Sequence, residues 1–130
     1  MPTRSTLARL AATLAIAALA IAALASTALA TRHIRIASEV TLAVGNPFHG
    51  KVNSKPYSHA CRPQRTVKVF RVDPGPDGLF GKTTTDQKGR WSMSGGMPHG
   101  KFYAVVKKLS QGTAGTIYVC KSDTSPTVQF

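Results

Sequence analysis

The sequence is poor in acidic residues. Its 130 residues include 5 Asp and Glu against 17 Lys and Arg, which gives a formal net charge of +12. Glu39 is the only glutamate, and Asp73, Asp77 and Asp86 fall in segments that we expect to be turns. A hydrolase that uses two paired carboxylates is therefore not expected, and no serine lies in a G-x-S-x-G motif. We expect a protein that is not an enzyme.

The sequence also lacks a long apolar repeat of helical spacing after residue 30, and short β-rich runs separated by Gly, Pro, Asn and Asp replace it. This pattern predicts an all-β fold, an antiparallel β-sandwich of about seven or eight strands, Ig-like or transthyretin-like. We expect strands within residues 34–44, 48–52, 65–72, 79–84, 90–93, 101–109, 116–120 and 126–130, and turns at 73–78, 86–89 and 110–115. The expected core consists of Val67, Val69, Trp91, Phe102, Ala104, Val106 and Tyr118.

The first thirty residues have the three parts of a secretory signal. Arg4 and Arg9 stand there without any acid, residues 11–25 are apolar apart from Thr13, and Ala28 and Ala30 form an A-x-A cleavage site. We expect a helical signal peptide over residues 1–30 and a single domain over residues 31–130, with 15 basic and 5 acidic residues and a net charge of +10. The alternative is an uncleaved membrane anchor, because residues 10–31 are long enough to span a bilayer. Cleavage predicts a secreted protein, extracellular or in the cell envelope, without a membrane partner.

The two cysteines are predicted to form one disulfide. Cys61 and Cys120 are 59 positions apart, and an even, minimal pair in an exported protein most simply forms one bond. A metal-binding pair is the alternative, but the sequence has no C-x-x-C motif, and two cysteines alone do not complete a structural zinc site.

Four segments in order resemble a known β-sandwich family. They are F-H-G-K-V at 48–52, residues 67–72, T-T-D-Q-K-G-R-W at 84–91 and P-H-G-K-F-Y-A-V-V at 98–106. Together they resemble carboxypeptidase regulatory-like and transthyretin-like domains, and the layout is similar to small, basic, exported bacterial proteins of unknown role. The resemblance implies that Asp86 caps a hairpin turn, Gly89 relaxes its exit and Trp91 anchors the returning strand. The sequence departs from the pattern in the loop around Cys61 and in the enlarged loop at 73–78.

The excess positive charge predicts that the protein binds a partner rather than catalyses a reaction. Six basic residues gather in one third of the chain, and we expect them to contact an anionic cell-wall or extracellular polymer: Lys51, Lys55, Arg62, Arg65, Lys68 and Arg71. The predicted late strands add Lys101, Lys107, Lys108 and Lys121. We expect no specific nucleic-acid partner, because Tyr103 and Tyr118 are equally explained as core residues. High charge also serves solubility and protects strand edges, which is the alternative explanation.

A copper site is the alternative function. Met93, Met97 and His99 supply soft thioether and imidazole ligands within one short segment, and such ligands suit copper in an exported protein. Packing of Met93 beside Trp91 explains the same residues without a metal. We expect no cofactor.

Overall fold

The computed structural model describes residues 30–43, 45, 48–94, 96 and 98–130. Apart from Ala30, the predicted signal peptide lies outside these residues. Thr31–Phe130 form one compact unit by their internal contacts. Among the described residues we find no helix with the length and hydropathy that crossing a bilayer requires.

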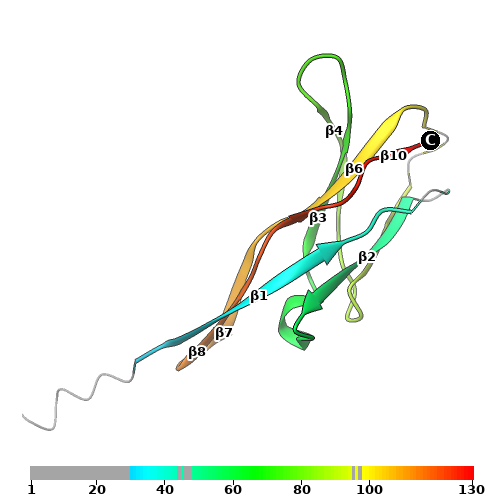
Figure 1. Ribbon diagram of the computed structural model, residues 1–130. Helices are drawn as coiled ribbons and strands as arrows, with labels where there is room; N and C mark the ends of the chain where they lie inside the picture. The colour runs from blue at the N-terminus through cyan, green and yellow to red at the C-terminus, as the bar shows by residue number, and fades with distance from the viewer. Residues whose placement is uncertain (1–29, 44, 46–47, 95, 97) are drawn as a thin grey trace, which may run out of the picture. The chain divides into compact units, whose positions relative to one another are not determined.

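The described chain is all-β, with ten strands and one turn of 3-10 helix (Figure 1). The elements are β1 (Arg32–Val40), β2 (Phe48–Lys55), η1 (His59–Cys61), β3 (Thr66–Arg71), β4 (Gly78–Thr84), β5 (Arg90–Met93), β6 (Lys101–Val106), β7 (Leu109–Thr113), β8 (Thr116–Cys120), β9 (Asp123–Thr124) and β10 (Val128–Gln129).

The strands form two sheets. The first has the order β5-β2-β1-β8-β7 and the second the order β10-β6-β3-β4, with β9 also paired to β6. The β3–β4 hairpin extends beyond the neighbouring strands at one end (Figure 1). The predicted all-β sandwich is therefore confirmed, with ten strands among the described residues instead of the expected seven or eight.

The direction of one strand pair differs from the expected antiparallel pattern. β1 pairs with β8 in parallel, with Ile36 opposite Cys120, whereas the other strand pairs run antiparallel. Strands so far apart in the chain are not joined by a hairpin, so no turn imposes their relative direction.

The segment 101–109, expected as one strand, is divided between the two sheets. β6 ends at Val106 in the second sheet, and β7 begins at Leu109 in the first. The predicted turn at 110–115 is consequently wrong over most of its length, because β7 continues to Thr113. Only Ala114 and Gly115 turn the chain into β8. The chain thus crosses between the sheets at Lys107 and Lys108.

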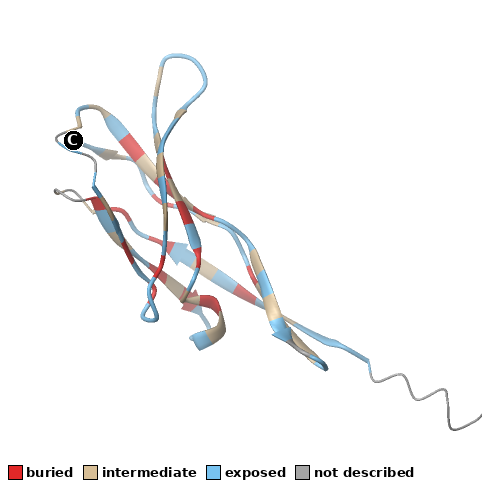
Figure 2. Cartoon of the chain, turned by 180° about the vertical axis from the view of Figure 1, so that it is seen from behind, coloured by how far each residue is buried: buried red, intermediate tan, exposed pale blue. Residues whose placement is uncertain are grey.

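Alternation along the strands builds the core. Buried residues alternate with exposed ones along β2, β3 and β6, and Figure 2 shows the buried positions spaced along the strands. Six of the seven expected core residues are confirmed as buried: Val67, Val69, Trp91, Phe102, Ala104 and Val106. Tyr118 is half-buried and packs instead against a second, smaller cluster of Ile36, Cys61 and Cys120.

Phenylalanine rings fill one end of the main core. The Phe48 ring centroid lies 5.1 Å from that of Phe80, 5.2 Å from that of Phe102 and 4.6 Å from that of Phe130. Phe80 reaches them because the register of β3 and β4 shifts between Val69 and Phe70, which leaves Phe80 without a cross-strand partner. Such a bulge turns one side chain out of the regular alternation.

The turn between β4 and β5 has the geometry that the sequence predicts. The Asp86 Oδ1 accepts hydrogen bonds from the backbone N–H of Lys88 at 2.8 Å and of Arg90 at 2.9 Å. Gly89 has a φ of 78°, and a Cβ atom there would collide with the Val52 carbonyl. Glycine is therefore required at this position, because the left-handed conformation and the close backbone both exclude a side chain.

The disulfide joins the connection after β2 to the end of β8. Cys61 and Cys120 are bonded, with their Cα atoms 5.4 Å apart and both side chains fully buried. The predicted pairing is confirmed. The bond ties η1 to the strand that lies beside β1, so it links segments separated by more than half of the compact unit.

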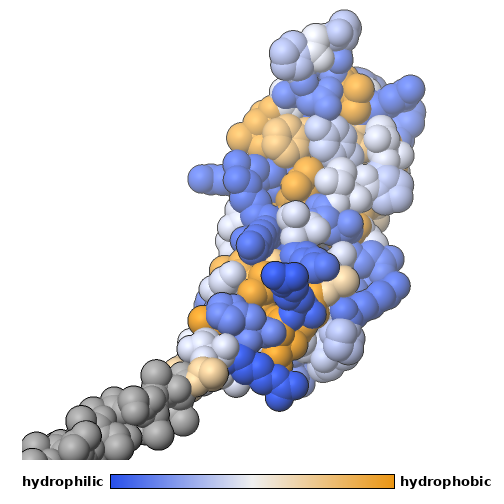
Figure 3. Space-filling view, turned by 60° about the vertical axis from the view of Figure 1, so that its left-hand side comes forward, coloured by the Kyte–Doolittle hydropathy of each residue, from blue (hydrophilic) through white to orange (hydrophobic). Residues whose placement is uncertain are grey.

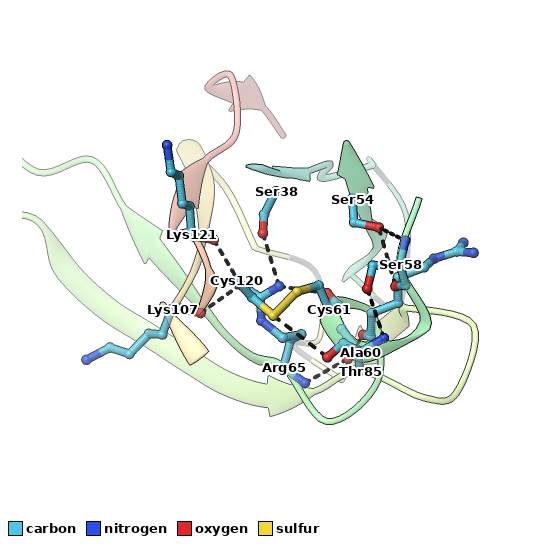
Figure 4. The surroundings of a disulfide bond; sticks show 11 residues. Ser38, Ser54, Ser58, Ala60, Cys61, Arg65, Thr85, Lys107, Cys120 and Lys121 are labelled. Carbon is cyan, nitrogen blue, oxygen red and sulfur yellow. Dashed lines mark hydrogen bonds between the residues drawn. A yellow bond between two sulfur atoms is a disulfide. The ribbon is translucent and has the colours of Figure 1, made fainter. Parts of the chain in front are cut away.

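Arg65 is fully buried beside the disulfide (Figure 4). Its Nη1 donates to the Cys61 carbonyl at 2.7 Å and to the Ser38 hydroxyl at 3.0 Å. Its Nη2 donates to the carbonyls of Lys107 at 2.9 Å and Lys121 at 3.0 Å. These acceptors come from η1, β1 and the ends of β6 and β8, so one side chain joins η1 to strands of both sheets.

The acceptors around Arg65 are all neutral. Burial lowers the pKa of the guanidinium from its ordinary value. The group remains charged because an arginine titrates far above physiological pH. The four hydrogen bonds of the two Nη atoms offset part of the desolvation cost of this charge, while the buried Nε has no hydrogen-bond partner among the described residues.

Removal of the disulfide should destabilise the fold strongly. The variant Cys61→Ala/Cys120→Ala is expected to lose about 4 kcal/mol of unfolding free energy, because the unfolded chain regains the freedom of a long closed loop. Equilibrium urea unfolding measures the loss. Wild-type protein unfolded and refolded under reducing conditions should match the double variant, and an unchanged urea midpoint in the double variant would contradict the prediction.

Replacement of Arg65 by lysine should also destabilise the fold. Arg65→Lys keeps the charge but loses the planar fork, and some of the four buried acceptors lose their donor, so we expect a loss of roughly 2–4 kcal/mol. The control is Arg62→Lys, which changes a neighbouring, partly exposed arginine and should cost less than about 1 kcal/mol. Equal losses in the two variants would show that the hydrogen bonds of Arg65 do not account for the effect.

Candidate functional site

The six basic residues predicted to contact a polyanion do not share one sheet. Lys51 and Lys55 lie on β2 in the first sheet, whereas Lys68 and Arg71 lie on β3 in the second. The two other arginines lie in the segment that connects β2 to β3. The expected basic face is therefore not built from this set.

Several members of the set already have partners. Lys55 Nζ lies 3.0 Å from Glu39 Oε2, and Arg71 Nε lies 2.9 Å from Asp73 Oδ1. The Arg62 guanidinium lies over the Tyr57 ring at 4.9 Å from its centroid. These contacts reduce the free positive charge that each side chain offers to a ligand.

The prediction that Arg65 contacts a polyanion is wrong. Its side chain has no exposed surface, and four of its donor contacts go to the protein itself. A basic residue is usually exposed, so nothing in its identity distinguished it from its neighbours.

The structure brings Lys68 together with a lysine on β4 and another just after β6. β3 pairs with β4 so that Lys68 is directly opposite Lys82. On the other side of β3, Lys68 is opposite Val105, and Lys107 follows two residues later with its N–H donating to the Thr66 carbonyl at 3.0 Å. Residues two apart on a strand share a face, so Lys68, Lys82 and Lys107 form one group, which we call the lysine triad.

The lysine triad lies on the outer face of the second sheet. Its strand neighbours Val67, Val69 and Val106 are fully buried on the inner face, while Lys82 and Lys107 are exposed and Lys68 is half-exposed. Neither of the two ion pairs found among the described residues includes a member of the triad. Its positive charge is therefore directed to solvent.

The two neighbouring lysines lower the pKa of Lys68. A side-chain hydrogen bond with Lys107 is the main cause, and the charge of Lys107, partial desolvation and the charge of Lys82 act in the same direction. Like charges held this close favour an anion that lies between them. Lys82 was not anticipated, because only the pairing of β3 with β4 places it beside Lys68.

An aromatic pair lies next to the triad on the same face. Phe70 and Tyr103 are cross-strand partners whose ring centroids are 5.5 Å apart with an interplanar angle of 18°. Leu79 stands opposite Phe70 on the other side, and its side chain is 54% exposed. The Tyr103 hydroxyl donates to Asp77 Oδ2 at 2.8 Å, and this bond raises the pKa of Tyr103.

Figure 3 shows one face of the molecule, on which strongly hydrophilic side chains surround smaller hydrophobic areas. The first sheet also carries exposed basic residues, since Lys51 is opposite Arg90 across β2 and β5. The positive charge is thus spread over both sheets, and the lysine triad is distinguished by its close packing and by the aromatic pair beside it.

An open cavity of about 510 Å³ lies where β4 approaches β5 and β2. Four of its nine lining residues carry a hydroxyl group, and Trp91 also lines it. Asp86 also lines the cavity, but its Oδ1 is engaged by the two N–H groups of the turn, which lower the pKa of this carboxyl. The lining residues are His49, Gly50, Thr83, Thr84, Thr85, Asp86, Arg90, Trp91 and Ser92.

The residues of the copper hypothesis are only partly described. Met93 packs against the main core, and its sulfur lies near Gly81. His99 is exposed, and Met97 lies outside the described residues. In the part of the chain that the structure covers, no three His, Cys, Asp or Glu side chains are grouped as metal ligands.

No protein-family model, curated protein or solved structure matches this chain. The site is accordingly interpreted from its own geometry and charge.

The triad should be visible in the titration of its central lysine. We expect Lys68 to deprotonate at lower pH than an ordinary lysine side chain, because the side chain of Lys107 and the charge of Lys82 disfavour its charged form. Lys107→Met removes the main repulsion and should move the pKa of Lys68 back toward the ordinary value for lysine. NMR titration of the side-chain ε-carbon resonances measures both. If Lys68 titrates at the ordinary value for lysine in the wild type, the three ammonium groups are not close in solution.

Proposed function

We propose that this chain is an exported, non-catalytic β-sandwich module that binds anionic polymers at the cell surface or outside the cell. The observation that carries the proposal is the lysine triad on the outer face of the second sheet. Three ammonium groups from β3, β4 and the end of β6 lie together there without an ion-pair partner among the described residues. A polyanion relieves their repulsion and releases its own counterions, and both effects favour binding.

Export is part of the same proposal. It is supported by the leader pattern of residues 1–30 and by the disulfide, since stable disulfides are typical of oxidising compartments outside the cytosol. The turn built from Asp86, Gly89 and Trp91 supports the resemblance to carboxypeptidase regulatory-like and transthyretin-like domains. We include that relationship in the proposal.

The polymer that we propose is recognised mainly by charge. The triad is flat and open rather than enclosed, and its ammonium groups are point charges without the fixed geometry of guanidinium forks. Such a site selects charge density more than chemical identity. Phosphate-rich and carboxylate-rich polymers of similar charge density should therefore bind comparably.

The test is a salt titration of binding to inorganic polyphosphate. The exported protein should lose affinity steeply as salt rises, and Lys68→Gln/Lys82→Gln/Lys107→Gln should reduce affinity at low salt by about tenfold or more. The slope of log affinity against log salt should also become shallower by about 2, since each lost contact contributes roughly 0.7 for a flexible polyanion. Fluorescence anisotropy with labelled polyphosphate measures both quantities.

A matched variant separates the triad from net charge. Lys51→Gln/Lys55→Gln/Lys88→Gln removes the same three charges from exposed positions outside the triad. This control should retain most of the affinity. If both triple variants lose affinity equally, binding reflects total charge alone, and if wild-type protein does not respond to salt, the proposal is wrong.

A further inference from the structure

Exposed apolar side chains gather on one hairpin. Among the described residues, four large hydrophobic side chains are exposed, and three of them belong to the β3–β4 hairpin: Val72 at 40%, Leu79 at 54% and Phe80 at 37%. Phe80 turns toward the core rings of Phe48 and Phe102, so Leu79 and Val72 are the exposed apolar residues of this hairpin that do not pack there. Scattered surface apolar residues need no explanation, but neighbouring ones indicate an interaction site. The fourth, Tyr57, lies far along the chain in the connection after β2 and is 61% exposed.

The exposed apolar residues of the hairpin lie beside the lysine triad. Leu79, Phe70 and Tyr103 form a row across β4, β3 and β6 on the outer face of the second sheet. One step along the strands, on the same face, the next row contains Lys82 and Lys68. Rows on one face are two residues apart, which is about 7 Å, so the apolar and cationic rows are in contact range of a single ligand surface.

The two carboxylates of the hairpin are engaged by the protein. Asp73 lies 2.9 Å from the Arg71 Nε, and Asp77 accepts the Tyr103 hydroxyl at 2.8 Å and the Asp73 N–H at 3.3 Å. These contacts hold the negative charges close to positive or hydrogen-bonding groups. The face as a whole therefore combines apolar side chains with excess positive charge.

We propose that this apolar and basic face docks onto an anionic lipid surface, with Leu79 and Val72 entering the headgroup region and the lysine triad contacting the lipid phosphates. The inference rests on the proposed function, because it uses the same lysines. It differs from the expectation drawn from the sequence, which gave the cleaved chain no membrane partner. An anionic lipid surface accommodates aliphatic side chains beside its charged headgroups, and aromatic side chains favour its interface.

The geometry favours lipid over a stacking ligand. Phe70 and Tyr103 are stacked on each other, so each ring already covers part of a face of its neighbour. A nucleobase or a sugar ring needs an open aromatic face. Leu79 and Val72 offer aliphatic surface and no ring at all.

The experiment compares vesicles with soluble polyanion, using exported protein produced from the full-length sequence. Phosphatidylcholine vesicles containing phosphatidylglycerol should sediment the wild type, and vesicles of phosphatidylcholine alone should not. Leu79→Ser/Val72→Ser should reduce binding to the anionic vesicles by about tenfold or more, because burial of these side chains is lost. The same variant should bind inorganic polyphosphate like the wild type.

Matched variants make each outcome decisive. Tyr57→Ser removes an equally exposed apolar side chain elsewhere and should leave vesicle binding unchanged. Replacement of the lysine triad by glutamine should reduce vesicle binding about fivefold per lysine. Binding of Leu79→Ser/Val72→Ser to anionic vesicles at wild-type strength would overturn the lipid inference and leave the proposed function intact.

Three other results would also overturn the inference. Polyphosphate binding without vesicle binding would restrict the face to soluble polymers, whereas absence of both would remove the proposed function itself. If analytical ultracentrifugation shows that the wild type self-associates and Leu79→Ser/Val72→Ser does not, the apolar row is occupied by a second copy of the chain instead.

Discussion

The arrangement of both sheets depends on one buried guanidinium. Arg65 donates to backbone carbonyls at the points where the chain leaves β6 and β8, and to groups in η1 and β1. Its backbone is held as well, since its N–H donates to the Thr85 hydroxyl at 2.9 Å and its carbonyl accepts from the Thr85 N–H at 3.0 Å. An arginine suits this place because its donors have a fixed planar geometry and its charge persists at physiological pH. The disulfide closes the same region covalently.

The buried cation also determines where a surface cation lies. The carbonyl of Lys107 accepts from Arg65, while its N–H donates to the Thr66 carbonyl on β3. Both backbone groups are thus fixed at the crossing between the sheets, and the Lys107 side chain is left on the outer face near Lys68. The geometry of the proposed binding site is in this way connected to the interior, although none of the triad is itself deeply buried.

Local pattern was sufficient to predict most of the fold. Alternation along residues 67–72 and 102–106 identified the core strands, because side chains on a strand alternate between two faces. Asp86 and Gly89 predicted a turn for conformational reasons that operate within a few residues. The division of residues 101–109 between two sheets was not predictable in this way, since both halves are β-rich and only tertiary pairing separates them.

The site was less predictable than the fold because it depends on pairing between distant strands. Six basic residues close together in the chain suggested one surface, but the sandwich separates β2 from β3 and places them in different sheets. The residues that do meet, Lys68, Lys82 and Lys107, are separated by intervals that only the β4-β3-β6 order explains. The burial of Arg65 was equally unpredictable from the sequence. Its acceptors are mostly backbone carbonyls, which every residue has, so no residue type marks them.

The two ends of the sandwich expose different surfaces to the solvent because they are stabilised in different ways. Near the disulfide, covalent and hydrogen-bonded links hold the chain, and apolar burial is limited to a small cluster around Ile36. At the opposite end, packing of phenylalanine rings replaces those links, and the bulge that turns Phe80 inward leaves Leu79 facing outward. The exposed apolar row is therefore a consequence of how that end of the core is filled. Its position beside the lysine triad follows from the register of β3 with β4, so the interior packing and the amphipathic outer face have a common structural origin.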